Sequence, residues 1–299
     1  MLKNYRLLAL FLLLLALPLS AIAQGSVINL IEQPDAQYTF DPDATLLEIV
    51  FPRIFSSDCA IIRFGEETML VDSSTESEDM HERIRIAIEL MGIDHFDIAY
   101  NSHPHRDHIM GFPIINEYAP FGKFLITFPA DYDWRMRKIV GQMEDSGVPV
   151  EVVGDGDRLS LGSNGEVSIE IFQRSVNKSW PLNDRSAMLR ITYGDRIFLM
   201  PGDNESRSQK YFAETLPAEI LKADILKYPH HGHAPMMIEF REAVAPELTI
   251  ATGAANIMKE TKKHLEQIGM PYLIAYQGTT RMRTDGRIWV VDYIEQPAE

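Results

Sequence analysis

Three histidines and an aspartate lie within six positions, in the segment His103-Pro104-His105-Arg106-Asp107-His108. This segment directly follows residues 96–100, a short apolar run that predicts a buried strand. Side chains two apart in extended chain point to the same side, so the first two histidines can hold one cation, whereas the last two residues need a turn. Imidazole and carboxylate ligands suit zinc, manganese or ferrous iron better than calcium or magnesium. We therefore predict a divalent metal site here rather than a polar surface loop.

Two later stretches place similar side chains after apolar runs. Asp203 follows the run 198–200, and a second histidine cluster at positions 230–233 follows the run 225–228. Six of the nine histidines therefore lie in two clusters, each behind a predicted strand. Loops at strand ends are where such scaffolds carry their chemistry. Lys227 precedes the second cluster, where we expect it to neutralise a substrate phosphate.

The elements that must position these side chains follow from hydrophobic periodicity. Residues 46–51, 59–64 and 68–72 predict a strand meander. Residues 80–91 place Met and Ile at helical intervals, with Gly92 beyond the end. Further strands are predicted at 124–128, 150–153, 167–172, 188–193 and 197–200, and a helix at about 134–143.

The amino terminus has the pattern of an export signal. Lys3 and Arg6 precede eleven apolar residues, and Ala21-Ile22-Ala23 supplies a small-residue cleavage site. The apolar run is short against the ~20 residues that span a bilayer. We expect a signal peptide at 1–23 cleaved after Ala23, an extended leader at 24–45, and one domain at 46–299. This predicts a secreted or periplasmic protein without an integral membrane segment after cleavage.

Composition restricts the partners. The 299-residue chain has 28 basic and 43 acidic residues and a formal net charge of −15. Binding of long duplex nucleic acid depends on many basic side chains, so the composition argues against it and favours a small molecule or a short nucleic acid. Cys59 is the only cysteine, which rules out an intramolecular disulfide.

Five motifs follow one another along the chain, namely Val71-Asp72, the segment 103–108, Asn183-Asp184-Arg185-Ser186, Pro201-Gly202-Asp203 and Pro229-His230-His231-Gly232. Their order resembles that of the metallo-β-lactamase-fold hydrolases. Within that group it is most similar to the hydrolase domain attached to the DNA-uptake channel ComEC. The resemblance covers about residues 46–291 and implies an α+β fold, a four-layer αββα sandwich with metals at one edge.

The resemblance also implies roles for the motif residues. His103 and His105 would hold a first metal, Asp107 and His108 a second, and Asp203 would bridge the two. Zinc is the expected ion and manganese the alternative.

The remaining site residues leave alternatives open. The last ligand would be His230 or His231, of which we prefer His230 because it is nearer the strand end. Asp72 would lie behind the ligands and orient them through hydrogen bonds.

This chain differs from many members of the wider fold in one feature that affects the number of bound metal ions. Many members of the wider fold supply another histidine to the first metal, but no histidine lies between residues 108 and 203. Asp184 is the nearest replacement. It is either an oxygen ligand of a site with two ions or an ordinary turn aspartate beside a site with one.

These ligands imply hydrolysis by a metal-bound hydroxide, with Asp107 orienting the water or accepting its proton and Asp203 holding the metals. A phosphodiester is the first expectation for the substrate. A lactone, β-lactam or thioester is the alternative, and a non-catalytic, metal-stabilised envelope binding module is a third hypothesis, because fold alone does not select a substrate.

Overall fold

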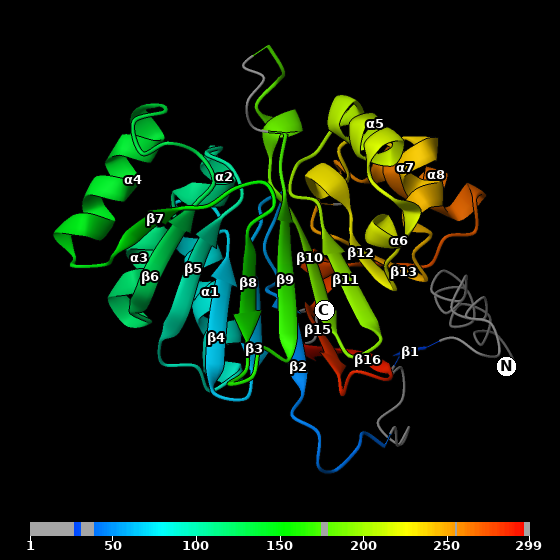
Figure 1. Cartoon of the computed structure of the whole chain (residues 1–299), viewed down its shortest axis with the longest axis horizontal. Helices are drawn as coiled ribbons and strands as arrows, with labels where there is room; N and C mark the ends of the chain where they lie inside the picture. The colour runs from blue at the N-terminus through cyan, green and yellow to red at the C-terminus, as the bar shows by residue number, and fades with distance from the viewer. Residues whose placement is uncertain (1–26, 31–38, 175–178, 255, 296–299) are drawn as a thin grey trace, which may run out of the picture.

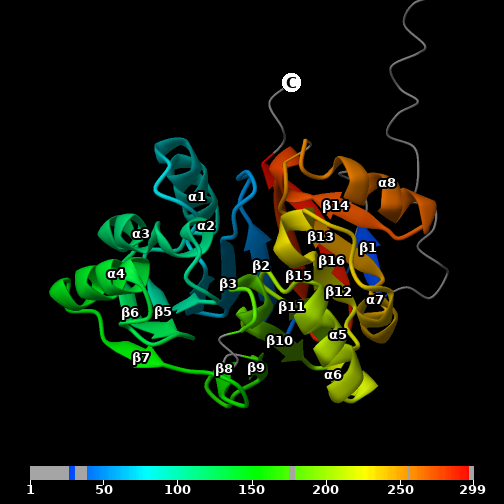
Figure 2. The same ribbon diagram turned by 90° about the horizontal axis from the view of Figure 1, so that it is seen from above.

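Two mixed β-sheets face each other, and helices cover both outer faces (Figures 1 and 2). This computed structural model describes residues 27–30, 39–174, 179–254 and 256–295. The predicted signal peptide at 1–23 lies outside the described residues. The arrangement confirms the predicted α+β, four-layer αββα sandwich.

The first sheet has the order β1-β16-β15-β2-β3-β4-β5-β6-β7. Its β2, β3 and β4 form the predicted antiparallel meander, whereas β4, β5, β6 and β7 are parallel. The strand β1 lies in the segment expected as an extended leader and pairs with β16 at the sheet edge. The strands are β1 (Ile28–Leu30), β2 (Leu47–Phe51), β3 (Ala60–Phe64), β4 (Glu67–Val71), β5 (Phe96–Asn101), β6 (Phe121–Ile126), β7 (Val150–Val152), β15 (Thr279–Thr284) and β16 (Trp289–Glu295).

The second sheet has the order β14-β13-β12-β11-β10-β9-β8. The predicted hairpin is formed by β10 and β11, and β11 to β14 run parallel. In β9 buried and half-buried residues alternate, as its sequence predicts. The strands are β8 (Arg158–Leu161), β9 (Val167–Phe172), β10 (Met188–Tyr193), β11 (Arg196–Met200), β12 (Ile225–Lys227), β13 (Leu248–Ala251) and β14 (Tyr272–Ile274).

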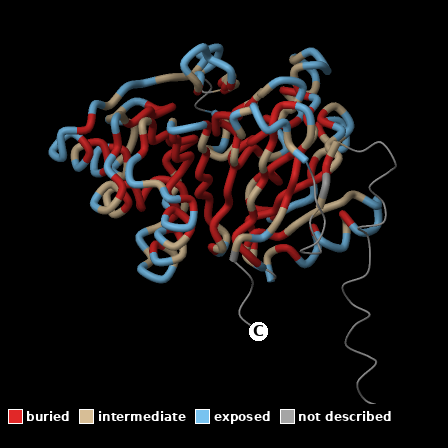
Figure 3. The backbone as a smooth tube through the Cα atoms, turned by 90° about the horizontal axis from the view of Figure 1, so that it is seen from below, coloured by how far each residue is buried: buried red, intermediate tan, exposed pale blue. Residues whose placement is uncertain are grey.

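Helices pack on the outer face of each sheet through separate apolar cores. One core lies between the sheets, a second under α1, α3 and α4, and a third under α5, α7 and α8. Figure 3 shows buried chain in the strands and exposed chain mainly on the outer helices and loops. The helices are α1 (Glu78–Leu90), α2 (Arg106–Ile109), α3 (Phe112–Tyr118), α4 (Trp134–Asp145), α5 (Ser206–Thr215), α6 (Ala218–Leu221), α7 (Ile238–Val244) and α8 (Lys259–Gln267), with 3-10 turns η2 (Asn183–Arg185), η3 (Pro229–Gly232) and η4 (Ala275–Gln277).

Parallel strands bring the motif loops together. The carboxyl ends of neighbouring parallel strands lie at one sheet edge, so the loops after β4 and β5 are neighbours, as are those after β11 and β12. Among the described residues, no helix is both long enough and apolar enough to cross a membrane.

Candidate metal centre

Asp72 organises the loop that follows β5. It adopts a left-handed backbone conformation with φ 57°, which is uncommon outside glycine and costs free energy. Its Oδ1 accepts hydrogen bonds from Ser102 N at 2.8 Å and Asn101 Nδ2 at 3.1 Å. Its Oδ2 accepts from Ser102 Oγ at 2.6 Å and lies 2.7 Å from His108 Nδ1. Asp72 therefore holds the loop and turns His108 Nε2 toward the opposite sheet.

His103 and His105 form the first group of candidate ligands. His103 Nδ1 lies 3.1 Å from Ser102 Oγ, which leaves its Nε2 facing His105 Nδ1 at 3.1 Å. His103 Nε2 is also 3.7 Å from Asp203 Oδ2. The two imidazole nitrogens converge because alternate residues of an extended segment point to the same side. The carboxylate oxygen of Asp203 lies beside them.

The short helix α2 turns the next two motif residues toward the same place. His108 Nε2 lies 3.1 Å from Asp203 Oδ2, and Asp107 Oδ2 lies 3.3 Å from His231 Nε2. His108 is fully buried, whereas about a third of the Asp107 side chain is exposed. Asp107 is therefore the motif carboxylate that a substrate or a water molecule can reach.

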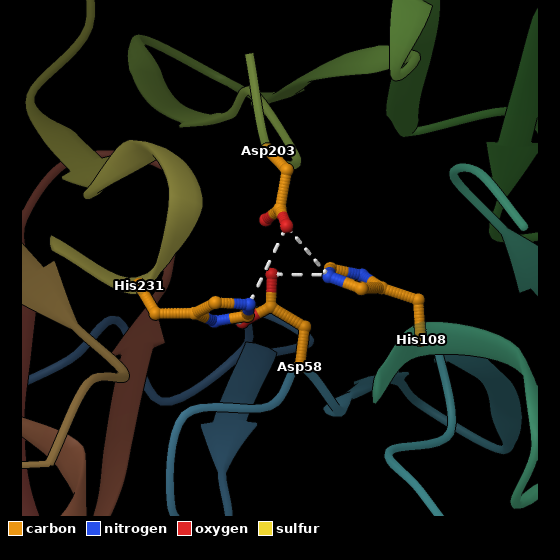
Figure 4. A group of neighbouring side chains, drawn as sticks. All are labelled: Asp58, His108, Asp203 and His231. Carbon is orange, nitrogen blue, oxygen red and sulfur yellow. Dashed lines mark hydrogen bonds and ion pairs between the residues drawn. The ribbon is translucent and has the colours of Figure 1, made fainter. Parts of the chain in front are cut away.

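His231 points into the buried centre (Figure 4), whereas the preferred His230 contacts Glu205. Both residues adopt left-handed conformations in η3, with φ 46° for His230 and 53° for His231. This backbone turns His231 Nε2 to 3.5 Å from Asp203 Oδ2, while His230 Nδ1 lies 2.9 Å from Glu205 Oε1. His230 Nε2 is 3.8 Å from the same Asp203 oxygen and remains partly exposed. The geometry favours His231 as the ligand, because nearness to the strand end does not set the direction of a side chain.

Asp58 was not identified from the sequence, although it is part of the centre (Figure 4). Its Oδ1 lies 3.1 Å from His231 Nδ1 and accepts a hydrogen bond from Thr252 Oγ1 at 2.8 Å. Because Asp58 binds the Nδ1 side of His231, we interpret it as a group that orients the ligand, as Asp72 does for His108. Its only sequence signal is a carboxylate two residues before the first residue of the buried strand β3.

The structure does not place Lys227 where it could contact a substrate phosphate. The side chain is fully buried and forms an ion pair with Asp58. Its Nζ also donates to Gly202 O at 3.2 Å and lies 3.8 Å from Asp203 Oδ1. Lys227 is in β12, where all three residues are buried, so its cation balances a carboxylate inside the protein.

Asp184 lies apart from both groups of candidate ligands. Its Oδ1 accepts hydrogen bonds from Ser208 N at 2.9 Å and Ser208 Oγ at 2.8 Å, in the first turn of α5. The structure thus gives Asp184 the bonding of a turn aspartate that caps a neighbouring element. Both bonds go to one oxygen and hold the carboxylate at α5, and Asp184 belongs to neither set of converging ligand atoms.

The electrostatics of the centre reflect close packing of opposite charges. Burial lowers the pKa of His231, but Asp203 and Asp58 outweigh this effect and raise it to about 10. Burial likewise lowers the pKa of His108, yet Asp203 and Asp72 carry it well above its usual value. Burial raises the pKa of Asp203, but His108 and His231 hold it well below its usual range. Imidazolium groups thus balance buried carboxylates, and a divalent cation can replace these protons.

The residues present fit a divalent metal. Asp203 Oδ1 and His231 Nε2 are buried without a hydrogen-bond partner among the described residues, an arrangement that costs free energy unless a cation satisfies it. Burial, followed by the charge of His108, lowers the pKa values of His103 and His105, so both offer neutral nitrogens. Potential ligand atoms lie within 4.8 Å of one another in two sets, Asp58, His108, Asp203 and His231, and His103, His105 and Asp203.

Comparison with known proteins defines the class. The sequence matches the metallo-beta-lactamase superfamily over residues 52–247, more than half of the chain. No curated protein matches it in sequence. The chain belongs to the metallo-beta-lactamase superfamily and has the fold of its metal-dependent hydrolases.

Several solved structures are similar to this chain. A variant of the CmlA β-hydroxylase has a TM-score of 0.51 and 15% identity over 82% of this chain, which spans 54% of that protein's length. CmlA of Streptomyces venezuelae is a diiron enzyme. A protein of Parabacteroides distasonis proposed to be a metal-dependent hydrolase has a TM-score of 0.49 and 16% identity, with 80% of this chain and 99% of that one covered. For YhfI from Bacillus subtilis the TM-score is 0.48 and the identity 13%, with 77% and 96% covered. At 15% identity the likeness to the CmlA variant shows the fold alone.

Proposed function

We propose that the protein is a metal-dependent phosphodiesterase that uses one or two divalent ions, zinc first and manganese as the alternative. The observation that carries the proposal is the position of Asp203 Oδ2. It lies 3.7 Å from His103 Nε2 on one side and 3.1 Å from His108 Nε2 on the other. One carboxylate therefore joins two adjacent sets of ligands, an arrangement suited to displacement at phosphorus.

The ligands divide into two positions. His103 and His105 would hold an ion at the first, and His108, His231 and Asp107 would hold an ion at the second, with Asp203 shared. A divalent ion at such a centre lowers the pKa of bound water and stabilises negative charge that develops on the substrate.

Asp107 would orient the attacking water. Burial raises its pKa, but the imidazole of His231, 3.3 Å away, and the charge of His108 lower it well below its usual value, so it stays a carboxylate at neutral pH. About a third of its side chain is exposed, so a water molecule at the centre can reach it. We therefore assign Asp107 the role of hydrogen-bond acceptor that orients this water.

The substrate class rests on the two-sided centre and on the resemblance to the hydrolase domain of ComEC. The five motifs occur in the same order, and the acidic composition favours a short substrate over long duplex nucleic acid. Hydrolysis of a lactone, β-lactam or thioester, and a non-catalytic envelope binding module, are the alternative outcomes of the test below.

We also propose that the protein is exported. The support is the sequence pattern of residues 1–23, with basic residues, an apolar run and a small-residue cleavage site after Ala23. Sequencing the amino terminus of protein recovered from a bacterial periplasm or medium tests this. A mature protein that begins at Gln24 is expected, and an intact Met1 would overturn the proposal.

The activity is tested with a substrate panel and metal analysis on the same preparations. The panel contains bis(4-nitrophenyl) phosphate, a chromogenic β-lactam and a lactone. Bound metal is measured by elemental analysis for the wild type, His105→Ala and Asp203→Ala. We expect turnover of the diester by the wild type, and loss of both turnover and metal in Asp203→Ala.

Each alternative has its own signature in this panel. Metal retained without turnover of any substrate would support the binding module. Lactam or lactone turnover without diester turnover would favour the carbonyl hydrolase. Loss of diester turnover in His105→Ala with unchanged lactam turnover would contradict a single shared site.

A further inference from the structure

Arg185 is a buried cation without a counter-ion. Its exposed fraction is 5%, and no carboxylate lies within 4 Å of its guanidinium among the described residues. The neighbouring carboxylate of Asp184 is bound to Ser208 instead. Burying an unpaired charge is costly, so this arrangement needs a compensating partner.

Aromatic rings supply part of the compensation. The guanidinium carbon lies 5.5 Å from the ring centre of Phe128 and 5.2 Å from that of Tyr132. Its Nη2 donates a hydrogen bond to the Tyr132 hydroxyl. Cation–π contacts of this kind are weaker than pairing with an anion.

Two of the guanidinium nitrogens remain without a hydrogen-bond partner among the described residues. Nε is occluded and unpartnered. Nη1 has no partner either, but it is not occluded. The side chain therefore keeps donors free for a ligand that carries its own oxygen atoms.

The backbone on both sides of Arg185 borders the metal centre. The following residues contact both motif loops: Ala187 N donates to Ser102 O at 3.1 Å, beside His103. Ser186 packs against Gly202, where an added Cβ would lie only 3.0 Å from Ser186 Cβ. On the preceding side, Asn183 Nδ2 lies 3.4 Å from His230 Nε2.

We propose that the Arg185 guanidinium binds a negatively charged phosphoryl oxygen of the substrate through Nη1. This inference rests on the proposed phosphodiesterase function and adds the residue that recognises the anionic group. The centre itself is rich in carboxylates, which repel a diester anion, so a cation at its border offsets that repulsion. Guanidinium donors also match the geometry of phosphoryl oxygens.

The proposal is tested by ligand binding, independently of turnover. The probes are dimethyl phosphate, the neutral trimethyl phosphate and acetate, titrated by NMR into metal-loaded protein. Arg185→Met keeps an unbranched side chain beside the two aromatic rings, and Arg185→Gln keeps a polar one. Arg190→Met is the control, because Arg190 is a half-buried arginine that pairs with Glu170 at 3.2 Å.

We expect both Arg185 variants to bind dimethyl phosphate at least tenfold more weakly than the wild type, with unchanged metal content and unchanged binding of trimethyl phosphate. The control should match the wild type. If acetate binding weakens to the same extent as dimethyl phosphate binding, the site binds anions in general, and the assignment to a phosphoryl oxygen is overturned.

Other results separate a structural role from a binding role. Lower thermal stability with unchanged affinity for dimethyl phosphate in either folded variant would make Arg185 a packing residue. No measurable binding to the wild type would also overturn the proposal. If the wild type binds dimethyl phosphate through Arg185 but hydrolyses no diester, the phosphodiesterase function fails and the anion site stands. If both variants hydrolyse the diester with the KM of the wild type, the phosphodiesterase function stands and the proposed anion site at Arg185 fails.

Discussion

At the scale of single residues, two buried carboxylates orient two histidines in the same way. Asp72 holds Nδ1 of His108 at 2.7 Å, and Asp58 holds Nδ1 of His231 at 3.1 Å. Each imidazole is thereby fixed with Nε2 toward Asp203. A carboxylate behind a metal-bound histidine fixes its ring and raises its basicity, which strengthens metal binding.

Asp58→Asn should therefore weaken metal binding by about 10- to 100-fold, because the amide is uncharged and holds His231 less firmly. Competition with a fluorescent chelator measures the change. Asp79→Asn on the exposed face of α1 is the control and should leave the affinity unchanged. An Asp58→Asn protein with wild-type affinity would show that the carboxylate does not orient the ligand.

The buried pair of Asp58 and Lys227 complicates this variant, because removing one partner leaves a buried charge that costs about 3–5 kcal/mol. The double variant Asp58→Asn, Lys227→Met removes both charges. It should regain most of the stability in urea unfolding while the metal affinity stays low. Recovery of metal affinity together with stability would mean that the first loss was only structural.

At the scale of elements, the site depends on how closely α2 and α3 approach the end of β4. Gly111 links these two helices, and its N–H donates to Ser73 Oγ at 3.1 Å. An added Cβ would lie 2.0 Å from Ser73 O and 2.5 Å from His81 Cε1. Its φ of −85° is ordinary, so glycine is required here for space and not for backbone freedom.

Gly111→Ala should destabilise the protein by about 2–3 kcal/mol, because backbone must move to admit the methyl group. Gly141→Ala in α4 is the matched control. An added Cβ there meets nothing within 4 Å, so alanine should be neutral or stabilise by up to about 1 kcal/mol. Urea unfolding measures both, and equal stabilities for the two variants would contradict the close approach at Gly111.

At the scale of the whole molecule, the candidate centre joins the two sheets. His103, His105 and His108 follow β5 of the first sheet, whereas Asp203 and His231 follow β11 and β12 of the second. An ion bound by both sets ties the halves of the sandwich together. Because such an ion binds only the folded arrangement, it adds its binding free energy to stability.

Metal removal should thus lower the melting temperature. An ion present at a thousandfold excess over its Kd stabilises by about 4 kcal/mol, which for a chain of this size corresponds to a shift of about 6–8 °C. Calorimetry with and without EDTA measures it. Asp203→Ala should show little response to EDTA, and a wild type that is insensitive to EDTA at all pH values would contradict a metal that bridges the sheets.

The sequence by itself determined the fold class and most of the strands. Apolar runs and their spacing are local properties, so β2 to β5, the β10–β11 hairpin, α1 and α4 were predicted close to their observed positions. The first histidine cluster was equally visible, because its residue types lie within six positions. The weak strand β8 and the one-turn helix α2 were missed, since few residues carry their signals.

Only the tertiary structure decided which side chains meet and which nitrogen points inward. Two consecutive left-handed residues turn His231 inward and His230 toward Glu205, and residue order does not report that conformation. Asp58 reaches His231 across 173 positions of chain. Lys227 and Asp184 are engaged by Asp58 and Ser208, partners that become neighbours only when the two sheets and α5 pack. Residue types indicated a metal, and packing assigned the atoms that face it.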